Sequence, residues 1–262
     1  MPEGHTVHRI ARQFARHFEG TPVAVSSPQG RFAGDAARID GRVIVDARAV
    51  GKQMFLEFDN GLWLRVHLGI YGAWDFAGRI DVPDARPAAG RRGSGPEYPD
   101  SLASIGAPRR LRMAEQERLG DAIEGFPPEP VGQVRVRLLT ADAVADLRGP
   151  TACEVLTGEE VQEVVDRLGP DPLVDSPKRG EQRFLEKAGR KNQPIALVLM
   201  DQNVVSGIGN IYRAEMLFRA RLDPFVPARE LPEDALRALW RDWTKLLKIG
   251  VETGYMLTME TR

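Results

Sequence analysis

Apolar residues recur at helical spacing at the start of the chain and throughout its C-terminal part. Residues 6–18 carry apolar side chains three or four positions apart, with arginines on the other faces, which predicts an amphipathic helix. In the last predicted helix, Trp240 and Trp243 share one stripe with leucines, so we expect core packing rather than stacking platforms. The five C-terminal helices are predicted at residues 159–168, 179–188, 195–201, 210–220 and from Pro232 onward.

Between these helical parts the polarity pattern is that of β-strands. Val134, Val136 and Leu138 alternate with arginines, which predicts a half-buried strand. A strong hairpin turn, Asp59-Asn60-Gly61, separates two further strands. The predicted strands cover residues 42–50, 53–58, 62–68 and 133–139.

The 262 residues are enough to bury cores in two domains. We place a mostly β N-terminal domain at residues 1–155 and a helical domain at 156–262, an α+β organisation. Residues 79–130 interrupt the first domain and hold eight of the 19 prolines. We predict a long loop or partly disordered insertion there, with a candidate short helix at 111–119.

Composition narrows the function classes. The net charge of -1 gives no sign of a nucleic-acid partner, so any basic surface has to be local. The single cysteine, Cys153, excludes a disulfide framework and a cysteine-rich zinc site within these residues, and it fits a reducing cytoplasm. No stretch reaches the roughly 18 apolar residues that a membrane span requires. The charge at the third residue is unlike a signal peptide.

The first residues offer a nucleophile. If Met1 is removed, Pro2 presents a secondary amine beside the carboxylate of Glu3. Such an amine can attack a sugar C1′ or an aldehyde to give an iminium ion, and Glu3 could move the protons that this chemistry needs. If Met1 is retained, the nitrogen of Pro2 is locked in a peptide bond and is not nucleophilic. The alternative is a chance Met-Pro start without chemical meaning.

A glycine-rich turn, Gly207-Ile208-Gly209-Asn210, lies between two predicted helices. Glycine lets a backbone come close to a ligand, and the start of the next helix offers amide groups and a positive dipole end to a phosphate. Asn210 adds a side-chain donor. The alternative is an ordinary turn in which Asn210 caps the helix.

A local positive charge surrounds this turn. Residues 178–219 contain eight basic and four acidic residues, a net charge of +4, beginning with Lys178 and Arg179. A positive patch beside an anion-binding turn favours a phosphate backbone, where most protein–DNA contacts fall. The alternative is a solvated charged face.

Four residues of the predicted hairpin region are further candidates. Lys52 opens the first hairpin strand, where a lysine is usually a solvated edge residue. His67 lies near the end of the second strand and could be a partly buried structural histidine. Ile70 and Tyr71 stand between two glycines and could form an apolar wedge of the kind that unstacks base steps. Core packing is the alternative for this pair.

Five segments carry the motifs of one family. They are Pro2-Glu3-Gly4, Gly51-Lys52, His67-Leu68-Gly69-Ile70-Tyr71-Gly72, Leu168-Gly169-Pro170-Asp171-Pro172-Leu173, and Leu199-Met200-Asp201-Gln202 through Gly209-Asn210-Ile211-Tyr212 and Glu215. In this order, over nearly the whole chain, they resemble the formamidopyrimidine-DNA glycosylase and endonuclease VIII family of base-excision repair enzymes. The last match is very specific. Tyr71 resembles the endonuclease VIII branch, because the methionine wedge of the other branch is absent there.

The resemblance implies a fold and a partner. The fold would be an N-terminal β-sandwich flanked by helices, followed by a helical domain with a helix–two-turn–helix DNA-binding element. The partner would be double-stranded DNA containing damaged bases or abasic sites, lying in the cleft between the domains. We expect a monomer in the cytoplasm, associated with the nucleoid as in bacteria, and no contact with a membrane.

The resemblance also assigns roles to the candidates. Pro2 would attack C1′, Glu3 would protonate the sugar and assist elimination, and Lys52 would hold phosphates and help proton transfer. The flipped-out nucleotide would leave a hole that Ile70 and Tyr71 fill. The expected phosphate contacts are His67, Gly209 and Asn210, with Lys178 and Arg179 in the positive patch.

Family members usually end in a zinc finger, or a zincless equivalent, whose arginine grips the DNA. Only Gly250 to Arg262 follow the last predicted helix, without a cysteine, so we expect no metal site and no cofactor in this chain. Three alternatives stay open: a damage-specific DNA-binding protein without catalysis, a glycosylase specific for oxidised purines, and an RNA-binding protein.

Overall fold

The computed structural model describes residues 2–80, 102–107 and 125–259. The chain forms two compact units. Unit 1 comprises Met1–Pro2, Ile10–Arg48 and Met54–Gly158, and unit 2 comprises Glu3–Arg9, Ala49–Gln53 and Glu159–Arg262. The sequence places a boundary after residue 155. In the structure, unit 2 also takes in two short segments from the N-terminal part of the chain.

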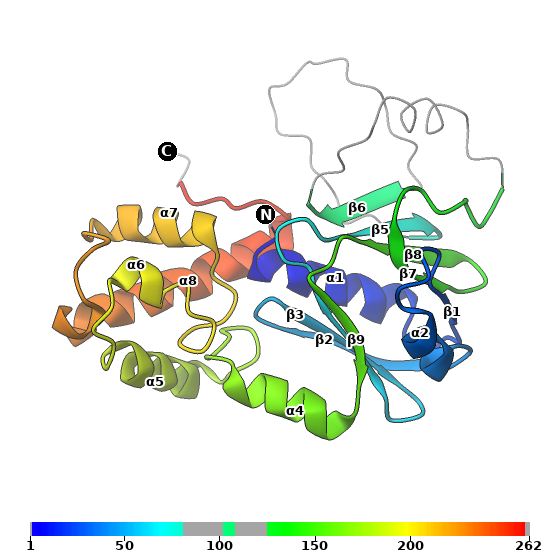
Figure 1. The fold of residues 1–262 in the computed structure, drawn as a ribbon. Helices are drawn as coiled ribbons and strands as arrows, with labels where there is room; N and C mark the ends of the chain where they lie inside the picture. Colours follow the sequence, from blue (N-terminus) through cyan, green and yellow to red (C-terminus); the bar gives the residue numbers. More distant parts are fainter. Residues whose placement is uncertain (1, 81–101, 108–124, 260–262) are drawn as a thin grey trace, which may run out of the picture. The chain divides into compact units, whose positions relative to one another are not determined.

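Unit 1 contains two antiparallel sheets and carries most of the β structure (Figure 1). One sheet has the order β1 (Ala24–Ser26), β7 (Val134–Leu139), β8 (Ala143–Arg148), β5 (Ala73–Gly78) and β6 (Leu102–Gly106). The other has the order β2 (Ile44–Val50), β3 (Gln53–Phe58), β4 (Trp63–His67) and β9 (Ala152–Leu156). The four predicted strands are confirmed as β2, β3, β4 and β7. The α+β class is confirmed as well.

Aromatic packing forms part of the core of unit 1. The helix α1 (Gly4–His17) brings Phe14 against Trp74 and Phe76 of β5, with ring centroids 4.8 and 5.3 Å apart. Both contacts are edge-to-face, the arrangement that ring quadrupoles favour. The helical spacing of residues 6–18 therefore predicted both the helix and the side that it buries. A second helix, α2 (Ala33–Ile39), was not predicted.

The proline-rich segment is not wholly irregular, so the prediction for residues 79–130 is wrong in part. Leu102–Gly106 forms β6, which pairs antiparallel with β5 in the register Ala73↔Gly106 and Ala77↔Leu102. This pairing joins residues about 30 positions apart and leaves no local period to detect. The candidate helix at 111–119 lies outside the described residues.

The helices of unit 2 follow the predicted pattern. They are α4 (Gly158–Arg167), α5 (Pro177–Ala188), α6 (Ile195–Val198), α7 (Asn210–Ala220) and α8 (Glu233–Thr253), with a 3₁₀ turn, η1, at Ala228–Glu230. α8 runs between α5 and α7 and contacts both (Figure 1). Trp240 and Trp243 are buried in its core, which confirms the prediction for the tryptophans. Among the helices that the structure describes, none combines the length and apolar character needed to cross a membrane.

Candidate active site

The carboxylate of Glu3 lies on the N-terminus of α7. Its Oε2 accepts hydrogen bonds from the amides of Gly209 (2.8 Å) and Tyr212 (3.3 Å), and its Oε1 accepts one from Ile211 (2.8 Å). The Glu3 residue is fully buried. An acidic group at this end of a helix satisfies amides that have no partner within the helix and gains from the helix dipole. Glu3 is therefore held in one orientation by three backbone donors.

This arrangement changes the interpretation of the glycine-rich turn. The sequence suggested that the first amides of α7 bind a phosphate, but the amides of Gly209, Ile211 and Tyr212 already donate to Glu3. The Asn210 residue is exposed at the first position of α7, and its side chain has no hydrogen bond to a described residue. Asn210 is thus the part of the turn that is available to a ligand.

Four glycines allow this close packing. A Cβ on Gly4 would lie 2.9 Å from Gly207 Cα, and one on Gly51 would lie 2.7 Å from Ser206 Cβ. A Cβ on Gly209 would lie 2.5 Å from Glu3 Cδ. The amide of Gly4 donates to the carbonyl of Gly207 at 2.8 Å. The glycines in three of the motifs therefore bring the chain start, the Lys52 turn and the α7 turn together within unit 2.

Lys52 lies in the electrostatic field of Glu3. Burial lowers the pKa of the Lys52 ammonium from its usual value, and the charge of Glu3 opposes that shift. A lowered pKa makes a lysine easier to deprotonate than a solvated lysine. The structure places Lys52 and Glu3 in the same unit, which the hairpin pattern alone did not predict.

His5 and Tyr212 form a buried pair that the sequence analysis did not single out. Their rings meet edge to face with centroids 5.4 Å apart. Burial, followed by the charge of Arg9, lowers the pKa of His5 to about 4, so the imidazole is neutral at pH 7. Burial raises the pKa of Tyr212. The backbone amide of Tyr212 donates to Glu3, so the packing of this pair helps to fix the position of one of the three donors to the carboxylate.

The remaining hairpin candidates lie in unit 1. His67 closes β4, and its carbonyl accepts from the amide of Thr151 at 2.9 Å. Ile70 and Tyr71 are 56% and 73% exposed, so core packing is excluded for this pair. Gly69, with φ of +64°, makes the turn possible. The turn presents two large apolar side chains to solvent, as a wedge would require.

The positive patch is smaller than the sequence suggested. Several of its basic residues are already paired: Arg183 with Asp175 (2.5 Å), Lys191 with Asp201 (3.1 Å) and Arg219 with Asp242 (2.8 Å). Lys178, Arg179 and Arg190 are exposed and form no ion pair with a described residue. These three, with the half-buried Arg213 and with Lys187, which donates to the carbonyl of Asn203, are the cations of the patch that form no ion pair with a described residue.

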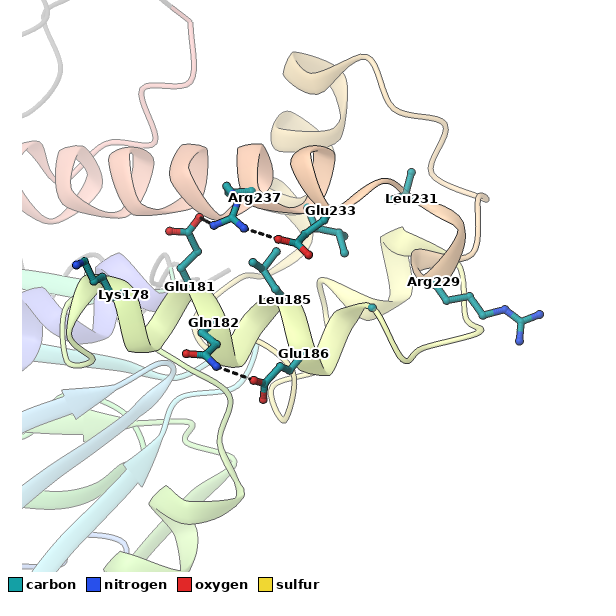
Figure 2. Close-up of a pocket in the computed structure, with 11 residues that line it drawn as sticks. Lys178, Glu181, Gln182, Leu185, Glu186, Arg229, Leu231, Glu233 and Arg237 are labelled. Carbon is teal, nitrogen blue, oxygen red and sulfur yellow. Dashed lines mark hydrogen bonds and ion pairs between the residues drawn. The ribbon is translucent and has the colours of Figure 1, made fainter.

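A groove between α5 and α8 begins at Lys178. Its volume is about 610 Å³, and Leu185, Leu231 and Leu236 contribute its apolar part. Figure 2 shows Arg237 between Glu181 and Glu233, with an ion pair to each. The charge of Arg237 is therefore compensated, and the groove contains none of the proposed catalytic groups. Across the described ranges, no group of three or more His, Cys, Asp or Glu residues could hold a metal ion.

Two family models match separate parts of the chain. Residues 1–121 match the N-terminal domain of formamidopyrimidine-DNA glycosylase. Residues 168–261 match the H2TH domain of the same family, which is the helix–two-turn–helix element. The second match covers α5 to α8, including the turn that holds Glu3.

Relatives cover nearly the whole chain. Endonuclease 8 1 of Mycobacterium tuberculosis is 40% identical over 261 residues, which are 99% of this chain and 80% of the relative. A formamidopyrimidine-DNA glycosylase of Thermus thermophilus is 37% identical over half of each chain. Among solved structures, the Lactococcus lactis Fpg protein in complex with DNA containing an abasic site has a TM-score of 0.69 at 17% identity, over 96% of this chain and 79% of that one. At this identity the likeness shows the fold.

Proposed function

Because the chain belongs to the formamidopyrimidine-DNA glycosylase and endonuclease VIII family, whose members are DNA glycosylases with AP lyase activity, we propose that it removes oxidised pyrimidines from double-stranded DNA by an N-terminal proline Schiff base. The observation that carries this proposal is the burial of the Glu3 carboxylate on three amides, next in sequence to Pro2. Two features favour the endonuclease VIII branch: the 40% identity to endonuclease 8 1, and Tyr71 in the wedge position.

The proposed reaction begins when the Pro2 amine attacks C1′ of the damaged nucleotide. The bond from C1′ to the base breaks, the base leaves, and opening of the sugar ring gives an iminium ion between Pro2 and C1′. Loss of a proton from C2′ then expels the 3′-phosphate by β-elimination, and a further elimination expels the 5′-phosphate. Hydrolysis of the iminium regenerates the amine. Every step uses groups of this chain, the DNA and water, so we propose that no cofactor takes part.

We assign the proton transfers of this reaction to Glu3 and Lys52. The Glu3 carboxylate would take the proton that the Pro2 amine loses, donate it to the ring oxygen of the sugar as the ring opens, and take another during elimination. The three amides hold it in place throughout, which reduces the reorganisation that the reaction requires. Lys52, with its lowered pKa, would contact phosphate and accept or return a proton close to Glu3.

The DNA contacts in this proposal come from both units. Asn210, Lys178 and Arg179 would bind phosphates from unit 2, while His67 would do so from unit 1. Ile70 and Tyr71 would fill the position that the flipped-out nucleotide leaves. A wedge with this role has to be exposed, and both side chains are exposed. We propose that the protein acts as a monomer on DNA of the bacterial nucleoid.

Borohydride is expected to trap a covalent adduct between abasic DNA and Pro2. The reagent reduces the iminium ion to a stable amine, and peptide mass mapping locates the adduct. Protein that keeps an N-terminal tag is the matched control: its Pro2 nitrogen is an amide, so no adduct should form. An adduct that maps to a lysine would contradict the proline mechanism. A panel of oxidised pyrimidines and oxidised purines tests the lesion preference, and faster excision of the purines would overturn that part of the proposal.

DNA affinity is expected to fall steeply with salt. Each phosphate that the protein neutralises contributes a slope of about -0.9 in a plot of log affinity against log salt. Asn210→Ala should weaken binding to damaged and undamaged duplexes alike, because a phosphate contact carries no sequence information. Fluorescence anisotropy at several salt concentrations measures both effects. Glu186→Ala on α5 is the control, and it should not weaken binding. A loss of affinity confined to damaged DNA would place Asn210 at the lesion instead.

A further inference from the structure

A buried carboxylate, Asp171, connects three segments of unit 2. Its Oδ2 accepts from His8 Nε2 at 2.8 Å and from the amide of Gly51 at 2.6 Å. Its Oδ1 accepts from the amide of Leu173 at 2.8 Å. Asp171 has no exposed surface, and His8 is 9% exposed. A carboxylate buried in this way is stable only with good hydrogen-bond partners, so each of these contacts matters for its position.

The role of His8 follows from the chemistry of the contact. A carboxylate can only accept, so the proton on His8 must be on Nε2. His8 lies in the first turns of α1, five residues after Glu3. The imidazole therefore links the helix that begins beside Glu3 to the oxygen that holds the amide of Gly51.

The Gly51 turn is constrained from two sides. Gly51 has a φ of +59°, and a Cβ there would lie 2.7 Å from Ser206 Cβ and 3.1 Å from the amide nitrogen of Gly207. Its own amide is fixed by Asp171. The next residue is Lys52, whose backbone position is set by this turn. Small shifts of Asp171 would thus move Lys52 relative to Glu3.

We propose that His8 is a positioning residue, which acts through Asp171 and Gly51 to hold the Lys52 ammonium in its working position near Glu3. The inference rests on the proposed function, since it assumes that Lys52 takes part in excision. His8 itself touches neither DNA nor a reacting atom in this scheme. Its effect should therefore appear in the rate of the chemical step and not in DNA affinity.

Two amide substitutions at position 8 test this proposal as a matched pair. In His8→Gln the side-chain NH₂ can take the place of Nε2–H and reach Asp171, whereas in His8→Asn the shorter side chain ends near the position of Nδ1. We expect His8→Asn to lower the single-turnover excision rate about tenfold with a DNA dissociation constant within twofold of the original, and His8→Gln to restore most of the rate. Leu236→Ala is the control for stability, because Leu236 is a buried core residue of α8 and is not among the hydrogen-bond partners of Asp171. It should lower the melting temperature without a comparable loss of rate.

A double-mutant cycle with Lys52→Ala identifies the route of the effect. If His8 acts through Lys52, adding His8→Asn to Lys52→Ala should lower the residual rate by less than twofold. Equal losses in both backgrounds would overturn the inference, as would full activity of His8→Asn or a loss in His8→Gln as large as in His8→Asn. The unmodified protein is assayed in parallel. If it does not excise any oxidised base, the proposed function fails; if it does and the pair at position 8 behaves alike, only the positioning role fails.

Discussion

Glu3→Gln is expected to lower base excision by about 10²- to 10⁴-fold, the range that a positioned acid or base contributes. Glutamine keeps the size of the side chain but has one acceptor oxygen and one donor group. The donor would face an amide N–H of α7, where Glu3 now accepts from Gly209, Ile211 and Tyr212. Leaving one of these buried groups without a partner costs about 1–3 kcal/mol of folding stability. Single-turnover excision and thermal melting measure the two effects.

The matched control is Glu181→Gln on α5. The Glu181 carboxylate accepts from Arg237 at 2.8 Å and lies in the groove between α5 and α8 (Figure 2). This substitution should leave excision unchanged, because an ion pair of this exposure contributes little. DNA affinity should stay within about threefold for Glu3→Gln, because the substitution keeps the size of the side chain and Glu3 acts in the chemical step of the proposed reaction rather than on a phosphate. An excision rate for Glu3→Gln close to that of the original protein would show that Glu3 is only a helix cap.

Gly209→Ala is expected to lower excision by about 10²-fold through a displacement of Glu3. The φ of Gly209 is -119°, which alanine adopts without strain. The added Cβ would lie 2.5 Å from Glu3 Cδ and 2.7 Å from Glu3 Oε1, so the carboxylate has to move away from the amides. A fully buried side chain has little room to move, and the acid would be misplaced relative to Pro2. Excision kinetics with an abasic-site and a damaged-base substrate measure the loss.

Gly34→Ala in α2 is the control for a glycine substitution as such. No atom lies within 4 Å of the Cβ position at Gly34, and alanine favours a helix, so activity should be unaffected. A structure of the Gly209→Ala variant should show Glu3 rotated off the α7 terminus. Normal excision together with an unmoved Glu3 would mean that α7 shifts instead, and that the fixed position of the acid is not required.

Much of the local structure was predictable because its causes are local. Apolar periods of 3.6 and 2 residues determine α1, α5, α7, α8 and the predicted strands, and Asp59-Asn60-Gly61 determines the turn between β3 and β4. Five strands were not predicted: β1, β5, β6, β8 and β9. For β6 the reason is that its partner β5 is distant in sequence and its surroundings are rich in proline. α6 ends at Val198, three residues earlier than its pattern suggests, and Asp201 instead binds Lys191 and the amide of Asn203.

The candidate site residues show the same difference between what is local in sequence and what depends on the fold. The sequence alone determined that Pro2, Glu3, Lys52 and Asn210 belong to motifs that could bind a ligand or take part in a reaction, since residue types and spacing carry that information. Only the tertiary structure decided that the amides of α7 serve Glu3 rather than a phosphate, because this contact joins residues 206 to 209 positions apart. Likewise, only packing decided that Ile70 and Tyr71 face solvent and that His8 and Asp171 support the Lys52 turn. Periodicity reports the burial of a segment, whereas the partner of a buried polar group depends on which distant segments the fold brings together.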